Sequence, residues 1–192
     1  GDGAEAPDAI TIDASVVDFQ SDVTTFGNID IDTGSTVDFD ASLTTEMGGS
    51  VTISNMGLLT LADEAVLDGE FDQDGTGPVS LSVGVSTTDD DISFNGVVTQ
   101  TDDSVVESGT GAGSISFASM IDSGDFNLDI SAGTGDVTLS AALINGGDVD
   151  VFDGAVMSFS AITADTLTVQ NVGTSATFDG MLQIAGNVDV EA

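Results

Sequence analysis

The tripeptide Val17-Asp18-Phe19 returns as Val37-Asp38-Phe39, and apolar–polar–apolar triplets of the same kind recur along the chain. Such alternation is typical of a short β-strand with one buried side. When the triplets are stacked, their third positions form one line that holds six of the ten Phe residues. The line comprises Phe19, Phe39, Leu61, Phe94, Phe117, Leu139, Phe159 and Phe178. Like residues stacked at a strand spacing of ~4.8 Å predict a continuous apolar ladder.

Two further alternating segments accompany each triplet. One set begins at Ile10, Ile29, Val51, Val79, Val105, Phe126, Val149, Leu167 and Val188, and a looser set contains Val23, Leu43, Val66, Val97, Ile121, Leu143, Ile162 and Leu182. Three short strands in about twenty residues, without a helical segment between them, indicate a coil. The sequence therefore predicts an all-β fold, a right-handed parallel β-solenoid (β-helix) of about eight rungs.

An antiparallel β-sandwich is the competing fold, because it also contains short strands at regular spacing. The pairs Asn95-Gly96 and Asn145-Gly146 are its best hairpin signals. Two-residue hairpin turns are otherwise scarce, and the threefold grouping favours the solenoid.

The predicted domain organisation is simple. Residues 1–9 form an N-terminal extension, and residues 10–192 form a single solenoid domain. Longer acidic loops are expected near residues 68–78, 84–91 and 100–104.

The charge is one-sided, with 34 acidic residues and no Lys, Arg or His. Nucleic acid and anionic membrane surfaces both require cations on the protein, so we expect neither as a partner. No apolar run is long enough for membrane insertion. Self-repulsion makes counter-ions necessary for a compact state. The lack of sites for trypsin-like proteases suits an extracellular or cell-surface location.

Calcium is the expected cofactor. Acids alternate in Asp68-Gly69-Glu70-Phe71-Asp72-Gln73-Asp74-Gly75, and such a turn closing on Gly can direct oxygen atoms at a hard cation. We expect Asp102 and Asp103 to lie one rung away at the same corner. The candidate calcium ligands are therefore Glu70, Asp72, Asp74, Asp102 and Asp103. A solvated acidic insertion is the alternative.

Catalysis is not expected. Without His, Cys or Lys the common nucleophile–base pairs cannot form, and a carboxylate-only glycoside hydrolase is the remaining enzyme class. An outward column of Ser and Thr side chains could bind ice, although ordinary strand propensity also explains it.

The two ends of the solenoid predict self-assembly. The chain carries a core-type strand at Val188-Asp189-Val190 and begins its first strand at Ile10-Thr11-Ile12. Uncovered strands and apolar end surfaces favour pairing with another copy. Ile10, Ile12, Val188 and Val190 are the predicted assembly interface.

Runs such as residues 165–174 resemble the β-helix repeats of filamentous-haemagglutinin-like and autotransporter-passenger proteins of bacterial surfaces. The resemblance extends from Ile10 to Val190 and implies an architecture and a bacterial surface setting. The absence of basic residues departs from that pattern.

The leading functional hypothesis is a structural subunit or segment of an extracellular bacterial filament, sheath or adhesin stalk. It would form a head-to-tail homopolymer supported by cations. The alternatives are an adhesin passenger that binds a glycan or surface through its loops or Ser/Thr face, and the carboxylate-only hydrolase.

Overall fold

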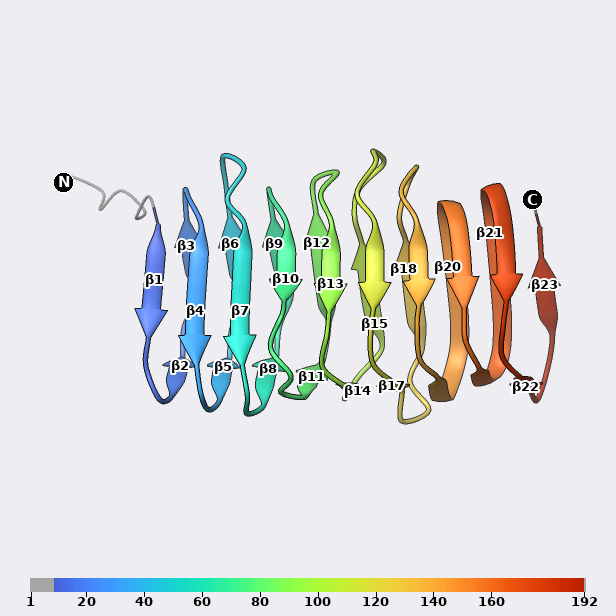
Figure 1. Cartoon of the computed structure of the whole chain (residues 1–192), viewed down its shortest axis with the longest axis horizontal. Helices are drawn as coiled ribbons and strands as arrows, with labels where there is room; N and C mark the ends of the chain where they lie inside the picture. Colours follow the sequence, from blue (N-terminus) through green and yellow to red (C-terminus); the bar gives the residue numbers. More distant parts are fainter. Residues whose placement is uncertain (1–8, 192) are drawn as a thin grey trace.

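The structure, a computed structural model, describes residues 9–191 as a parallel β-solenoid of about nine rungs, without any helix in that range (Figure 1). Most of the predicted extension, residues 1–8, and residue 192 lie outside the described part. Each rung contributes one strand to each of three faces, here called A, B and C. In Figure 1 the face A strands run down the front and the chain returns behind them while advancing from the N- to the C-terminal end, so the coil is right-handed.

Face A begins each rung. Its strands are β1 (Ile10–Asp13), β4 (Ile29–Thr33), β7 (Val51–Asn55), β10 (Phe71–Gln73), β13 (Ile92–Phe94), β16 (Ile115–Phe117) and β19 (Val137–Leu139). Two long strands, β20 (Leu143–Phe159) and β21 (Ile162–Phe178), each bend round two corners and end on this face.

Faces B and C follow in the same order. Face B contains β2 (Val17–Phe19), β5 (Val37–Phe39), β8 (Leu59–Leu61), β11 (Val79–Leu81), β14 (Val98–Gln100), β17 (Ile121–Asp122), the starts of β20 and β21, and β22 (Leu182–Ile184). Face C contains β3 (Val23–Thr25), β6 (Leu43–Thr45), β9 (Ala65–Leu67), β12 (Gly84–Thr87), β15 (Ser104–Glu107), β18 (Leu128–Ser131), the middles of β20 and β21, and β23 (Val188–Val190).

The corners between faces are called the AB, BC and CA edges. Within each face, the strands pair in parallel with the strands of the neighbouring rungs, in register at Ile10 and Ile29, Val17 and Val37, and Val23 and Leu43. In β4, for example, Ile29 and Ile31 point inward and Asp30 points outward, following the two-residue period of a strand. The sequence pattern of alternating apolar and polar residues therefore produces a dry interior and a polar exterior.

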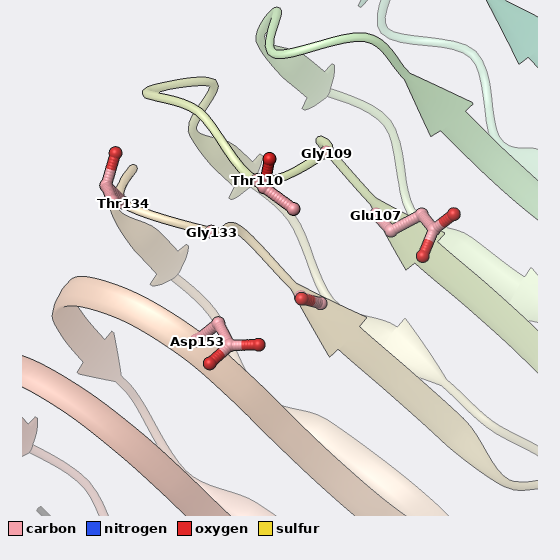
Figure 2. Close-up of a pocket in the computed structure, with 7 residues that line it drawn as sticks. Glu107, Gly109, Thr110, Gly133, Thr134 and Asp153 are labelled. Carbon is pink, nitrogen blue, oxygen red and sulfur yellow. The ribbon is translucent and has the colours of Figure 1, made fainter.

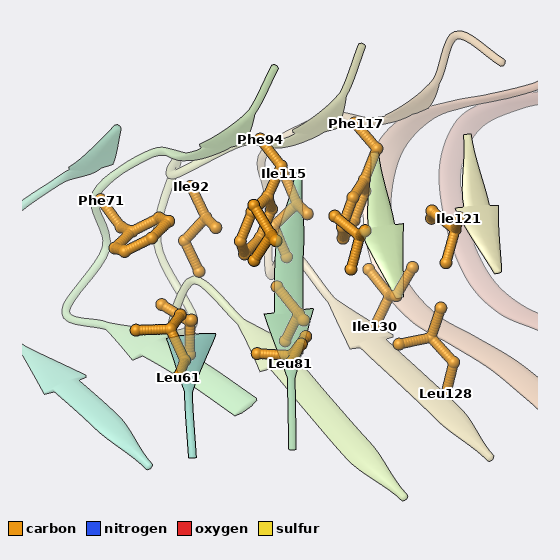
Figure 3. Close-up of a cluster of buried hydrophobic side chains, with 14 of the residues drawn as sticks. Leu61, Phe71, Leu81, Ile92, Phe94, Ile115, Phe117, Ile121, Leu128 and Ile130 are labelled. Carbon is orange, nitrogen blue, oxygen red and sulfur yellow. The ribbon is translucent and has the colours of Figure 1, made fainter. Parts of the chain in front are cut away.

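Aromatic and aliphatic stacks fill the interior (Figure 3). The rings of Phe94 and Phe117 lie 5.0 Å apart and nearly parallel, and Phe71 lies 5.1 Å from Phe94. Phe19 and Phe39 form a separate stack at 4.8 Å. These separations fall within the range favourable for aromatic pairs. Burial of these stacked apolar side chains is the main source of stability.

The fold class is confirmed, whereas the rung count and part of the register need correction. Two strands, β10 and β12, lie inside the segments predicted as acidic loops near residues 68–78 and 84–91. Missing them removed about one rung from the predicted count. It also merged two columns, because Phe19 and Phe39 lie on face B, whereas Phe94 and Phe117 lie on face A.

The reason is visible in the composition of the two strands. β10 contains Asp72 and Gln73, and β12 opens with Gly84, which are residues that rarely favour strands. Pairing with neighbouring rungs overrides this local preference, since β10 is held between β7 and β13.

Replacing a stacked Phe tests the column assignment. Phe117→Asp should unfold the central rungs, because loss of a buried Phe alone costs about 3–5 kcal/mol and the new carboxylate would be buried without a partner. Ser116→Asp, on the same strand but pointing outward, should leave the thermal melting temperature nearly unchanged. Similar melting temperatures for the two variants would contradict the assignment.

Candidate functional site

The segment predicted as a calcium loop is part of a wall of the solenoid. Its centre is strand β10, in which Phe71 and Gln73 face inward and Asp72 faces outward. Asp72 Oδ1 accepts a hydrogen bond of 2.5 Å from the Ser93 hydroxyl of the next rung. Asp74 Oδ1 accepts one from the Ser54 hydroxyl of the preceding rung. Both carboxylates therefore link rungs to each other.

Gln73 holds this segment from the inside. Its side chain is fully buried, and its amide nitrogen donates to Asn55 Oδ1 at 2.7 Å and to the Gly75 carbonyl at 2.8 Å. Its amide oxygen accepts from the backbone N–H of Asn95 at 3.0 Å and of Gly96 at 2.8 Å. All the bonding capacity of the buried amide is used, as stability requires.

The glycine that closes the predicted loop serves close packing. A Cβ at Gly75 would lie 2.1 Å from the Asn55 carbonyl oxygen and 2.2 Å from the Asn55 backbone nitrogen. Only Gly permits the backbone to approach the preceding rung this closely. The D-x-D-G pattern at this corner is thus explained by stacking.

The five predicted ligands do not converge on one point. Glu70 lies at the CA edge, Asp72 on face A and Asp74 at the AB edge, whereas Asp102 and Asp103 lie at the BC edge. The expectation that the last two lie one rung from Asp72 or Asp74 is wrong, because β10 and the 101–103 connection belong to different faces. Between residues 9 and 191, no three acidic side chains come together in an arrangement that could hold a metal ion.

Glu70 instead belongs to an acidic cluster on the CA edge. Partial burial raises the pKa of its carboxyl group above the ordinary value, and the negative charges of Asp72, Asp91 and Asp90 raise that pKa further. Burial and like charges both disfavour the ionised form.

Asp103 lies in a second acidic cluster, which lines a groove of about 260 Å³ between the BC edge and face C. Asp103 Oδ1 accepts the backbone N–H of Asn127 at 2.8 Å. Asp129 on β18 pairs directly with Asp150 on β20. The pKa of Asp129 is raised by burial first, and then by the charges of Asp150 and Asp103.

Asp129 was missed because the strand predicted at residues 126–128 ended one residue before it. The structure places the strand later, with β18 beginning at the inward Leu128 and pointing Asp129 outward. The alternation Leu128-Asp129-Ile130, matched by Val149-Asp150-Val151, was the signal that could have found the pair.

Edge carboxylates share a role as acceptors for backbone N–H groups of neighbouring rungs. The oxygen atoms of Asp68, Asp91 and Asp136 accept from Gly48, Ser114 and Val156 at 2.7, 2.7 and 3.0 Å. Hydrogen bonds from N–H groups to a carboxylate are stronger than neutral ones. Much of the acidity therefore serves to join rungs.

A larger open groove of about 480 Å³ crosses three rungs at the CA edge (Figure 2). Its walls carry the carboxylates of Glu107 and Asp153 and the hydroxyls of Thr110 and Thr134. These groups can accept hydrogen bonds from a polar ligand such as a sugar.

The predicted assembly residues lie at the two ends. Among the residues that the structure describes, β1 pairs with β4 alone and β23 pairs with β21 alone, so each has one edge without a described partner. Val188 and Val190 are 50% and 48% exposed. Ile10 and Ile12 are partly buried against the core. They belong to face A and the two valines to face C, so the four residues lie on different faces.

The acidic pair on face C predicts a pH-dependent stability. A carboxyl group with a raised folded-state pKa stabilises the fold while protonated, and this contribution is lost as pH rises through that pKa. Asp129→Asn should therefore raise the melting temperature at pH 7 and have little effect below the ordinary Asp pKa of 3.8.

The matched control is Asp189→Asn, which lies in the same outward row beside Thr168. It removes one charge without relieving an aspartate pair. An equal rise in melting temperature for both variants at pH 7 would mean that only total charge matters.

Comparison of the chain with protein-family models, with curated proteins and with solved structures found no match. The described residues contain no helix of the length and apolarity needed to cross a membrane. The solenoid is compatible with the β-helix repeat proteins that the sequence resembles, and its function has to be inferred from its own geometry.

Proposed function

We propose that the chain is a structural subunit or segment of an extracellular bacterial filament, sheath or adhesin stalk, extended by end-on β-stacking. The observation that carries the proposal is the in-register parallel stack of about nine rungs, whose described part has β1 paired with β4 alone and β23 paired with β21 alone. Unpaired edges and apolar end surfaces favour addition of a further rung. The lack of His, Cys, Lys and Arg supports a non-catalytic role, and the family resemblance supports the bacterial surface setting.

The pairing register defines how a second copy would stack. If the three columns continue without rotation, β1 of the next copy follows Ala176–Phe178 at the end of β21, with Ile10 above Ala176. β2 follows β22, and β3 follows β23. This replaces the expected contact between Val188–Val190 and Ile10–Ile12, since those segments occupy different faces.

Apolar side chains would continue into each other across this junction. Phe178 would meet Ile12, and Ile184 on β22 would meet Phe19, extending the two interior stacks. The contact is heterologous, so it repeats without closing and generates a filament. Nine rungs add roughly 43 Å per subunit at ~4.8 Å per rung.

Blocking the free edge of β23 tests the proposal. The Leu167 N–H donates to the Asn187 carbonyl, and the Glu191 N–H donates to the Val169 carbonyl, which leaves the N–H of Val188 on the free side. Val188→Pro removes that donor without breaking a bond to β21, so it should abolish filaments in electron micrographs while the melting temperature changes little.

The control is Val188→Ala, which keeps the N–H group and should still assemble. Monomers of the unmodified protein at high salt, indistinguishable from Val188→Pro, would refute end-on assembly of separate copies.

Cations, including calcium, are proposed to support assembly by neutralising the acidic edges. Because the five predicted ligands do not converge, we assign this effect to screening along the edges and to no single site. Equal millimolar concentrations of CaCl₂ and MgCl₂ should then raise the melting temperature by the same amount. A rise with calcium alone would reveal a specific calcium site.

A further inference from the structure

An apolar stripe runs along the whole AB edge. At each rung it uses the outward residue immediately before the face B strand, and its members are Val16, Thr36, Leu58, Pro78, Val97, Met120, Ala142, Ala161 and Met181. Eight of the nine are apolar. Strand alternation explains their direction, because the next residue is buried after each of the first eight members, as at Val17 and Val98, while Leu182 after Met181 lies on the terminal rung and is 37% exposed.

Backbone hydrogen bonds hold these residues in register. The N–H of Val17 donates to the Thr36 carbonyl at 3.0 Å, and the N–H of Val37 donates to the Leu58 carbonyl at 2.9 Å. The pattern continues to the last rung, where the Ile162 N–H donates to the Met181 carbonyl at 3.0 Å. Nine positions at ~4.8 Å give a straight stripe roughly 38 Å long.

The stripe is partly open to solvent. Val16, Leu58, Pro78 and Met181 are exposed, whereas Thr36, Val97, Met120, Ala142 and Ala161 are half-buried. Met56, next to Leu58 on the same edge, is also exposed. Extended apolar surface of this kind marks interaction sites in soluble proteins.

Acids are fewer at this edge than at the other two. The nine AB connections contain two acids, Asp74 and Asp179, and Asp13 and Asp32 at the ends of β1 and β4 lie in the same row as Asp74. The BC connections contain Asp22, Asp40, Asp63, Glu64, Asp102, Asp103, Asp125, Asp148 and Asp165, and the CA connections contain Glu46, Asp68, Glu70, Asp89, Asp90, Asp91, Asp136 and Asp153. The AB edge is therefore the side along which another acidic body meets the least repulsion.

We propose that the AB edge is a lateral interface with a second copy of this chain. Anionic membranes and nucleic acids are disfavoured as occupants by the net charge of −34. A second copy carries the same charge, but the two can meet edge to edge with their acidic BC and CA edges turned outward. Both copies carry the same stripe with the same length, so the stripe of one copy can contact the stripe of the other along its whole length, as a twofold interface requires.

The order of side-chain sizes in part of the stripe favours the antiparallel arrangement. About a twofold axis at Val97, Leu58 meets Ala142 and Thr36 meets Ala161, so larger residues face smaller ones at these two pairs, while Pro78 meets Met120 and Val16 meets Met181. A parallel arrangement would place Leu58 against Leu58 and Ala142 against Ala142. Alternation of large and small residues across a contact gives the better packing.

Single cysteines test this arrangement, since the chain has no Cys of its own. Under oxidising conditions in 1 M NaCl, which shortens the Debye length to about 3 Å, Val97→Cys should form covalent dimers by itself. Leu58→Cys and Ala142→Cys should form them only when the two variants are mixed, because a disulfide needs Cα atoms within about 7 Å. Intact mass measures the dimers.

The control is Val105→Cys, which is 46% exposed but lies on face C, and it should remain monomeric. Self-linking of Leu58→Cys would overturn the antiparallel arrangement. Equal linking of Val97→Cys and Val105→Cys, or none at either position, would overturn the lateral interface and leave the stripe to a different partner.

A second measurement does not depend on thiol chemistry. In 1 M NaCl, sedimentation should show a dimer for the unmodified protein and for Val105→Glu. It should show only monomer for Val97→Glu combined with Met120→Glu. Lateral pairing changes particle width and end-on stacking changes particle length, so electron micrographs separate failure of this interface from failure of the proposed filament.

Discussion

Each strand residue of this solenoid lies beside its counterpart one rung away, and the rest of the structure depends on that constraint. In-register parallel pairing places each strand residue ~4.8 Å from its counterpart on the next rung, so side chains at matching positions become direct neighbours. For Phe94 and Phe117 the repetition is favourable, because the rings stack in a dry interior. For Asp129 and Asp150 it is costly, because two carboxylates of like charge become direct neighbours.

The chain accommodates its charge without a single basic residue. On face A, Asp72 lies between the hydroxyl residues Thr52 and Ser93, so that acids alternate with hydroxyls along the axis. At the edges, carboxylates such as Asp91 accept backbone N–H groups of the next rung. Backbone N–H and hydroxyl groups thus donate to the carboxylates the hydrogen bonds that Lys and Arg donate in ordinary acidic proteins. Electrostatic repulsion between carboxylates is greatest at the BC and CA edges, where most of the acids of the connections lie.

The sequence predicted the architecture because a strict two-residue alternation and a repeat of about twenty residues leave few alternatives to a coil. Prediction failed where a strand lacks the usual residues. β10 is held by pairing on both sides and by the buried amide of Gln73, neither of which is visible in local propensity. Each missed strand moved later segments to the wrong face, which is why Asp72 and Asp103 were expected together. The Asp129–Asp150 pair had a signal in the matching triplets that contain these two residues, whereas the AB stripe depends on register across all rungs and could be found only once that register was known.

The same register governs how the molecule would respond to tension. The hydrogen bonds between rungs run along the solenoid axis, and within residues 9–191 β23 pairs with β21 alone. A force applied to the end of the chain therefore loads one strand's bonds at a time and peels the solenoid from its end. Each rung of about twenty residues would release roughly 70 Å of extended chain. A stalk built this way would lengthen in many small steps under load, and the undisturbed rungs would serve as the template on which the released chain could rewind.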